Sequence, residues 1–270
     1  MNNILVVGEL INGTRKAVKE AVINHDDQFI KDLARQQAEA GADYIDVNVA
    51  TGHGDREASD MEWAVKLIEE VVDVPLAIDS SDPGAMETGL KTCSKNTPML
   101  NSVSAEPGRL DPFLSLAATY NTPVVALPIK DSGIPPSAEE RLEVCKFITE
   151  EAAKRNIKPE NIYFDPLVLP LGVDSANPSV TMDTIRKIKQ EINGAKTLVG
   201  LSNVSYGLPN RKLLNQIFLA LCIQAGLDAA LLNPNDRSTM AVLKATEALT
   251  GRDAMCMNYL RAYRQGLLKD

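Results

Sequence analysis

Eight short apolar runs recur along the chain, and they constrain the fold more than any other feature of the sequence. Each run is rich in β-branched and aliphatic residues with little polar alternation, which is typical of parallel strands covered on both faces. Successive runs start between about 23 and 40 residues apart, which leaves room for a crossover helix after each strand. The runs are Ile4–Gly8, Tyr44–Val47, Leu76–Ile78, Met99–Leu100, Val124–Leu127, Ile162–Phe164, Leu198–Leu201 and Ala229–Leu232.

Helical patterns separate most of these runs. The segments Ser59 to Glu62 and Ser137 to Glu140 each predict a capping box, and Asp82-Pro83 supplies a cap with a first-turn proline. We therefore expect an α/β protein, a (β/α)8 TIM barrel forming one domain over residues 1–270, since such barrels fold about 250 residues as a unit. An open doubly wound sheet is the competing architecture, but no Gly-x-Gly-x-x-Gly turn follows the first run.

The charge balance argues against two classes of binding partner. The formal net charge is −8 and no run of Lys or Arg occurs, so the chain lacks the basic surface that nucleic acids and anionic membranes require. The segment Met1 to Ile4 is not a basic leader, and no apolar run approaches the roughly 18 residues of a membrane span. We expect a cytoplasmic protein that binds neither nucleic acid nor a membrane.

Thiols and imidazoles are too few and too scattered for several kinds of site. Only two histidines occur, His25 and His53. The absence of a Cys-x-x-Cys pair argues against structural zinc, and the scarcity of imidazoles weakens a Ser-His-Asp triad. We expect no metal site, and we expect the cysteines to be buried and reduced. They are Cys93, Cys145, Cys222 and Cys256.

Acids and amides follow seven of the eight apolar runs, at the strand ends where β/α barrels carry their active sites. For any one of them, Asp46 or Asn233 for example, an Asx turn or a helix cap is the alternative. The fifth run instead ends at Pro128 and Lys130. The set comprises Glu9, Asn12, Asp46, Asn48, Asp79, Asn101, Asp165, Asn203 and Asn233. It suits a heterocycle with many N–H and C=O groups, such as a pterin, better than a phosphorylated sugar.

Six segments, taken together and in order, resemble the methyltetrahydrofolate:corrinoid methyltransferases. That pterin-binding barrel family also includes dihydropteroate synthase and the folate domain of cobalamin-dependent methionine synthase. Leu10 is a departure, because the family usually has Gly-Glu-Arg-Ile-Asn at the first strand, and it puts the role of that arginine in doubt. The segments are Gly8 to Gly13, Asp46 to Val49, Ile78 to Ser80, Leu100 to Ser102, Tyr163 to Leu167, and Gly200 to Ser205 with Asn210-Arg211.

The resemblance implies roles for particular residues. Asp79, Asn101 and Asp165 would hold the pterin ring, Gly200 and Ser202 would shape the pocket, and Asn203 would lie nearest the reacting nitrogen. We expect Asn203 and Asp79 to act in catalysis, Asn203 by a hydrogen bond to that nitrogen in the transition state and Asp79 by its negative field. Further candidates for substrate binding are Glu9, Asn12, Asp46, Asn48 and Arg211.

The resemblance also implies a reaction and a partner. The methyl group would move between methyltetrahydrofolate and cobalt, in either direction. The Asp-x-His-x-x-Gly pattern that holds cobalamin is absent around both histidines, so a separate corrinoid protein is expected to carry the cobalt. It would dock over the barrel mouth, where 132–136 and 167–171 are candidate surfaces. Both loops could equally be lids or part of a homodimer face, and the apolar second loop favours burial. The family resemblance suggests a homodimer.

Two rival functions stay open. A dihydropteroate synthase would carry a Thr-Pro-Asp-Ser-Phe-Ser type of loop after the first strand and Arg-x-His on the eighth, and neither Gly13 to Lys16 nor Leu231 to Pro234 matches. A non-catalytic folate-binding barrel would keep the ring-holding residues and lose the group beside the methyl. The presence of Asn203 favours an enzyme.

Overall fold

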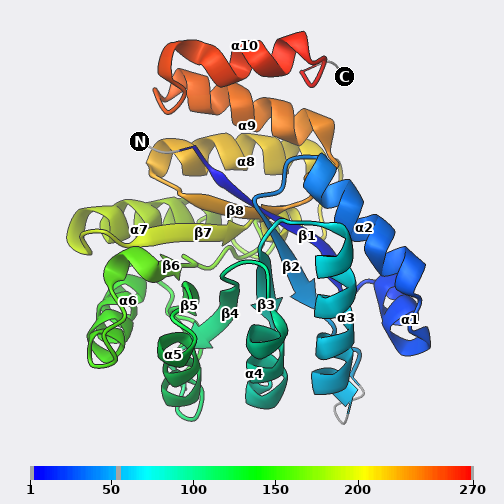
Figure 1. The fold of residues 1–270 in the computed structure, drawn as a ribbon. Helices are drawn as coiled ribbons and strands as arrows, with labels where there is room; N and C mark the ends of the chain where they lie inside the picture. The colour runs from blue at the N-terminus through cyan, green and yellow to red at the C-terminus, as the bar shows by residue number, and fades with distance from the viewer. Residues whose placement is uncertain (1–2, 53–55, 269–270) are drawn as a thin grey trace.

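The computed structural model describes residues 3–52 and 56–268 and forms a closed barrel of eight parallel strands in the order β1 to β8 (Figure 1). The eight-strand prediction is confirmed, and the open doubly wound alternative is wrong because β1 pairs with β8. His53 lies outside the described residues. The strands are β1 (Leu5–Asn12), β2 (Tyr44–Asn48), β3 (Leu76–Asp79), β4 (Met99–Ser104), β5 (Val124–Leu127), β6 (Ile162–Phe164), β7 (Lys196–Gly200) and β8 (Ala229–Leu232).

Helices surround the barrel, and the last of them, α10, packs on α9 outside this ring (Figure 1). The α-helices are α1 (Lys16–Asn24), α2 (Asp27–Glu39), α3 (Glu57–Val71), α4 (Pro83–Thr92), α5 (Leu110–Thr119), α6 (Ala138–Ala153), α7 (Asn177–Glu191), α8 (Arg211–Ala225), α9 (Arg237–Leu249) and α10 (Met257–Arg264). Short 3-10 helices are η2 (Pro159–Asn161), η3 (Leu201–Ser205) and η4 (Ala254–Cys256). No helix of the described residues is long and apolar enough to cross a membrane.

Two of the three expected helix starts are confirmed. The side chains of Asp82 and Ser137 accept the backbone N–H groups of Ala85 and Glu140, which caps α4 and α6. The third prediction is wrong, because α3 begins at Glu57, so that Ser59 lies inside the helix and its hydroxyl donates back to the carbonyl of Arg56. The acidic first turn of α3 favours this earlier start through the helix dipole.

The barrel interior positions the polar residues of the site. Its core consists of Val7, Ala77, Met99, Val125, Tyr163, Leu198 and Ala229. Side chains two positions apart on a strand point to the same face, so the residues that follow these core positions by two also face inward, toward the carboxyl ends of the strands. That set includes Glu9, Asp79, Asn101 and Asp165, and Asp46 follows the inward-facing Tyr44 in the same way.

Gly8, inside β1, leaves room for a close packing contact. A Cβ at this position would lie 2.5 Å from Oε1 of the fully buried Gln37 on α2. The same oxygen accepts the backbone N–H of Leu10 at 2.9 Å. It does so where the pairing of β1 with β2 shifts register between Gly8 and Ile11. Leu10 stands where the resembling family usually has an arginine, and its apolar side chain is buried.

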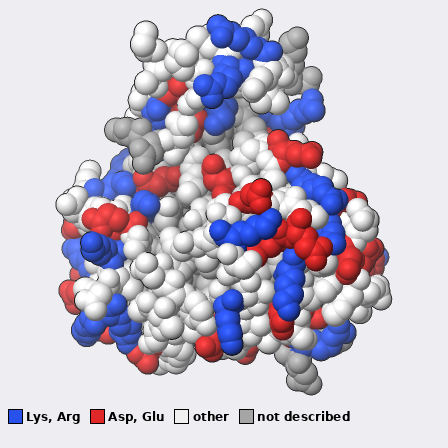
Figure 2. All heavy atoms as spheres, viewed as in Figure 1, with Lys and Arg blue, Asp and Glu red and all other residues white. Residues whose placement is uncertain are grey.

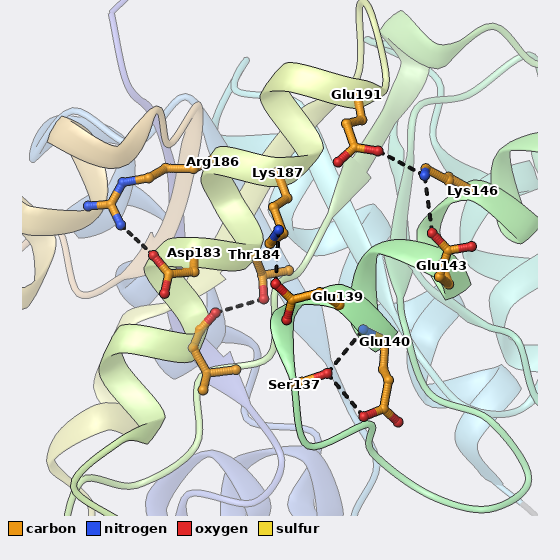
Figure 3. A network of polar contacts seen from close by, with 11 residues as sticks. Ser137, Glu139, Glu140, Glu143, Lys146, Asp183, Thr184, Arg186, Lys187 and Glu191 are labelled. Carbon is orange, nitrogen blue, oxygen red and sulfur yellow. Dashed lines mark hydrogen bonds and ion pairs between the residues drawn. The ribbon is translucent and has the colours of Figure 1, made fainter.

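Ion pairs tie neighbouring helices together on the surface. Between α6 and α7, Lys187 pairs with Glu139 at 2.9 Å, and Lys146 bridges Glu143 and Glu191 at 3.1 and 2.8 Å (Figure 3). Lys and Arg are interspersed with Asp and Glu over the face seen in Figure 2. Exposed pairs of this kind each contribute about 0–1 kcal/mol, so the barrel core carries most of the stability.

Candidate active site at the barrel mouth

A buried acid and an amide from opposite sides of β3 meet inside the barrel mouth. Nδ2 of Asn101 on β4 donates to Oδ1 of Asp46 on β2 at 3.0 Å. Asp46 is fully buried, and its second oxygen has no hydrogen-bond partner among residues 3–52 and 56–268. Burial, with the neighbouring Asp79 carboxylate, raises the pKa of Asp46 well above its ordinary value. The Asp46 carboxyl therefore lies beside Asn101 inside the barrel mouth, and the alternative of a turn or cap residue is wrong.

A second acid–amide pair lies beside the first. Nδ2 of Asn48, the last residue of β2, donates to Oδ2 of Asp79 at 3.0 Å. Oδ1 of Asn48 accepts the backbone N–H of Ala50 at 3.1 Å, so both ends of the Asn48 amide are engaged. Burial raises the pKa of Asp79 to about 6, the Asn48 hydrogen bond opposes that rise, and Arg109 adds a favourable field. Asp79 can therefore take or release a proton near neutral pH.

Three carboxyl groups from adjacent strands share this space. Glu9 on β1 and Asp79 on β3 each interact electrostatically with Asp46, which lies on the strand between them. Burial also raises the pKa of Glu9. Acids whose pKa values are raised, together with their amide partners, offer hydrogen-bond acceptors and donors in one place, which suits a heterocycle that carries both N–H and C=O groups.

Asp165 follows β6, and the segment after it is held by an arginine that the sequence analysis missed. Its Oδ1 accepts the backbone N–H of Leu167 at 2.8 Å. Burial raises the pKa of Asp165 to about 6, against the favourable charge of Arg141. Arg141 on α6 is only 1% exposed, and its guanidinium donates to the carbonyls of Pro135, Pro166 and Leu167. The available signal was an arginine on the apolar stripe of that helix, next to Leu142.

The turn after β7 is braced from two sides. The Ser202 hydroxyl lies 3.0 Å from one carboxylate oxygen of Glu9 and 3.1 Å from the other. From α8, Arg211 donates through Nη2 to the Ser202 carbonyl at 2.7 Å and through Nε to the Ser205 hydroxyl at 3.1 Å. The structure thus places Arg211 as a support of η3.

Asn203 lies on the exposed side of this turn. No hydrogen bond of its side chain to another described residue occurs. A Cβ at position 200 would lie 3.2 Å from its Nδ2, so Gly200 leaves the space that the amide occupies. An exposed amide without a partner at the mouth can bind a ligand atom at small cost.

The other features named from the sequence have different outcomes. Asn12 accepts both the N–H and the hydroxyl of Thr14, and Asn233 accepts the N–H of Asn235, so both form Asx turns. Lys130 pairs through its backbone with Gly133 in a tight loop.

The cysteines differ in burial. Cys145 and Cys222 are buried and Cys93 is partly buried, but Cys256 is exposed, which contradicts the expectation of four buried thiols. Cys256 precedes α10, an element that the repeat pattern did not predict.

The two loops considered as docking surfaces differ. In 132–136 every residue except Pro135 is exposed. In 167–171, Leu167 and Val168 are buried, and the N–H of Leu171 donates to the carbonyl of Val204 at 2.9 Å. The second loop therefore packs against η3, as its apolar composition favoured.

Comparisons with known proteins find pterin-binding relatives of the chain. A family model described as pterin binding enzyme matches residues 8–233. The chain is 38% identical to a methylcorrinoid:tetrahydrofolate methyltransferase from Eubacterium limosum over 268 residues, 97% of each protein. It is 30% identical over 244 residues to methionine synthase from Mycobacterium leprae (strain TN), where the match covers 86% of this chain and 20% of the relative.

Superposition on solved structures shows which known fold the barrel resembles. The dihydropteroate synthase of Xanthomonas albilineans superposes with a TM-score of 0.69 at 20% identity, covering 92% of this chain and 93% of that one. The 7,8-dihydropteroate synthase from Vibrio fischeri ES114 gives 0.68 at 16% identity, covering 93% and 94%. At such low identity these likenesses establish the barrel and carry nothing about the reaction.

Proposed function

The chain belongs to the family of pterin-binding enzymes, and we propose from that membership that it transfers a methyl group between tetrahydrofolate and the cobalt of a corrinoid carried by a separate protein. The observation that carries the proposal is the 38% identity, over nearly the whole of both chains, to a methylcorrinoid:tetrahydrofolate methyltransferase. The matched segment contains both acid–amide pairs, Asp46 with Asn101 and Asn48 with Asp79.

The ring-binding role rests on complementary hydrogen bonding. The aminopyrimidinone edge of a pterin presents several N–H donors, and a carboxylate can accept two of them side by side. We assign this role to Asp165, with Asn101 and Asp79 on neighbouring strands. Gly200 and Ser202 shape the wall next to the ring, while Asp46 and Asn48 orient the groups that touch it.

The chemistry requires control of one proton. When tetrahydrofolate accepts the methyl group, N5 forms a bond to the methyl carbon, the cobalt–carbon bond breaks with its electron pair left on cobalt, and the N5 proton departs. In the reverse direction cobalt attacks the methyl carbon, and N5 must gain positive character before its bond to that carbon can break. Asn203 would hydrogen-bond N5 in the transition state, and Asp79 would supply negative field and receive the proton, directly or through water.

The physiological direction, partner and assembly are further parts of the proposal. The relative's name has methylcorrinoid as the methyl donor, and we assign the same direction to this chain. The corrinoid protein would dock over the mouth, beside the exposed loop 132–136. We retain the sequence-based predictions that the chain acts as one domain, assembles as a homodimer and works in the cytoplasm.

An anaerobic mixing experiment tests the reaction. The protein is mixed with methyltetrahydrofolate and photoreduced free cob(I)alamin, and the visible spectrum is followed for conversion to methylcobalamin. Enzyme-dependent conversion is expected, and heat-denatured protein is the control. Absence of both conversion and folate binding in calorimetry would refute the pterin assignment. Binding without transfer, to free corrinoid or to any corrinoid protein supplied, would instead support the non-catalytic folate-binding barrel.

A further inference from the structure

A second pocket adjoins the acid cluster at the barrel mouth, on the side where β7, β8 and β1 end. It has a volume of about 440 Å³ and shares Glu9 and Ser202 with the site described above. Its outer wall carries three exposed cations, Arg15 before α1 and Arg211 with Lys212 at the start of α8. We call this space the tail pocket.

The cations of the tail pocket are only partly neutralised. Lys212 pairs with Asp236 at 2.8 Å. Asp236 is itself the cap of α9, where it accepts the N–H and the hydroxyl of Thr239. Glu9, the other acid of the lining, accepts from Ser202. Glu9 also interacts electrostatically with Arg15 and Arg211. Arg15 has no side-chain hydrogen bond or close ion pair within the described part of the chain, and its side chain does not cap α1. Its N–H groups are therefore open to a ligand anion.

One residue of the pocket lining has an acceptor without a partner. Oδ1 of Asn215, one turn further along α8, is buried without a hydrogen-bond partner among the residues that the structure describes. A buried amide oxygen without a donor is costly, so a donor that reached this atom would be bound favourably. The pocket lining thus contains cations that attract carboxylates and one amide oxygen without a donor.

The chemistry of the substrate indicates what enters this space. In a reduced folate, N5 is bonded to C6, and C6 carries the p-aminobenzoyl-glutamate tail. Whatever residue holds N5 must therefore lie close to the path of the tail. Asn203, the residue assigned to N5, follows Ser202, which lines both the pterin site and the tail pocket. The tail would leave the ring on this side and meet the pocket next.

We propose that the tail pocket binds the glutamate tail of the folate substrate, with its carboxylates on Arg15, Arg211 and Lys212 and a peptide N–H on Asn215. This inference rests on the proposed function and adds a specificity, namely a preference for folates that carry several γ-linked glutamates. Because the cations are exposed, the contribution of each is modest and falls with increasing salt.

The test compares three ligands on the full-length protein. They are methyltetrahydrofolate with one glutamate, the same compound with three glutamates, and 5,6-dimethyltetrahydropterin, which keeps the ring and the N5 methyl group but has no tail. The variants are Arg15→Gln, Lys212→Gln and the double variant. Lys19→Gln is the matched control, because Lys19 is exposed one turn further along α1 and does not line the pocket. Arg211 is left intact because it supports η3.

Dissociation constants measured by calorimetry at low salt separate the outcomes. The wild type should bind the triglutamate about three- to tenfold more tightly than the monoglutamate, and the double variant should lose that preference. The affinity of the double variant for the tail-less pterin should differ from that of the wild type by less than twofold. Equal losses for all three ligands, or an unchanged preference, would overturn the inference. The inference would also be overturned if the substitutions changed only the Michaelis constant for the corrinoid protein and left the affinity for all three folate ligands unchanged. A wild type that binds the pterin but shows no tail preference would overturn this inference alone, whereas failure to bind any of the three would overturn the proposed function as well.

Discussion

The amide of Asn101 donates to the fully buried carboxyl of Asp46 at 3.0 Å, across 55 positions of sequence. This contact decides which end of the Asn101 amide faces the mouth, because the N–H that binds Asp46 is turned away and the carbonyl oxygen is left for a ligand donor. Asp46 therefore acts through Asn101, as a positioning residue.

Substitutions at Asp46 should separate shape from charge. Asp46→Asn keeps an acceptor for Asn101, and burial already raises the pKa of Asp46 well above its usual value, so folate affinity should stay within about threefold. Asp46→Ala frees the Asn101 amide and opens a cavity, so affinity should fall by about tenfold or more. Calorimetry with methyltetrahydrofolate measures both. Equal losses for the two variants would mean that the ionised carboxylate itself is required.

Asn203→Ala should slow methyl transfer by about a hundredfold, the usual effect of removing one transition-state donor. Folate affinity should change by less than about threefold, because the hydrogen bond is strongest in the transition state. Stability should be nearly unchanged, since the side chain is exposed. Single-turnover kinetics with cob(I)alamin measure the rate, and Asn235→Ala, an exposed amide after β8, is the control. A rate within threefold of the wild type would remove Asn203 from the mechanism.

The sequence predicted which residues line the mouth better than it predicted how they pair. Asp79 and Asp165 were found because a parallel strand has a recognisable apolar run and a barrel puts catalytic groups where such runs end. The contacts of Asp46 with Asn101 and of Asn48 with Asp79 depend on strand register around a closed barrel, which no local pattern encodes.

Other misses have equally local causes. Arg141 stands on an apolar helix stripe, and only the three loop carbonyls that converge on it explain its burial. Asn12, the last residue of β1, and Asn203, shortly after β7, are both amides near strand ends, yet one forms an Asx turn and the other is exposed without a partner among the described residues. That difference follows from the backbone path after the strand, which propensities do not determine.

Arg141→Met should destabilise the protein by about 3 kcal/mol, because it leaves the carbonyls of Pro135, Pro166 and Leu167 without their donor in a buried site. It should also weaken folate binding, since the same segment carries Asp165. Urea denaturation measures the first effect and calorimetry the second. Arg186→Met is the matched control, because Arg186 forms an exposed pair with Asp183 at 2.6 Å (Figure 3), and its loss should cost less than about 1 kcal/mol. Similar losses in both variants would contradict the role given to Arg141.

Asp79→Asn should change stability in a pH-dependent way, because burial raises the pKa of Asp79 to about 6. Below the unfolded value near 4 the carboxyl is protonated in both states, whereas between about 4 and 6 only the folded chain holds the proton. The stability that this proton contributes is therefore present at low pH and is lost as pH rises through 6, where the folded chain must bury a charge. The asparagine retains an acceptor for Asn48 and carries no charge. Relative to wild type, the variant should thus gain about 1–3 kcal/mol between pH 5 and pH 8. Urea denaturation at both pH values measures the difference.

Asp165→Asn should behave in the same way, since the pKa of Asp165 is also raised to about 6. If the stability difference from wild type were the same at pH 5 and pH 8 for both variants, neither carboxyl would be buried as a charge.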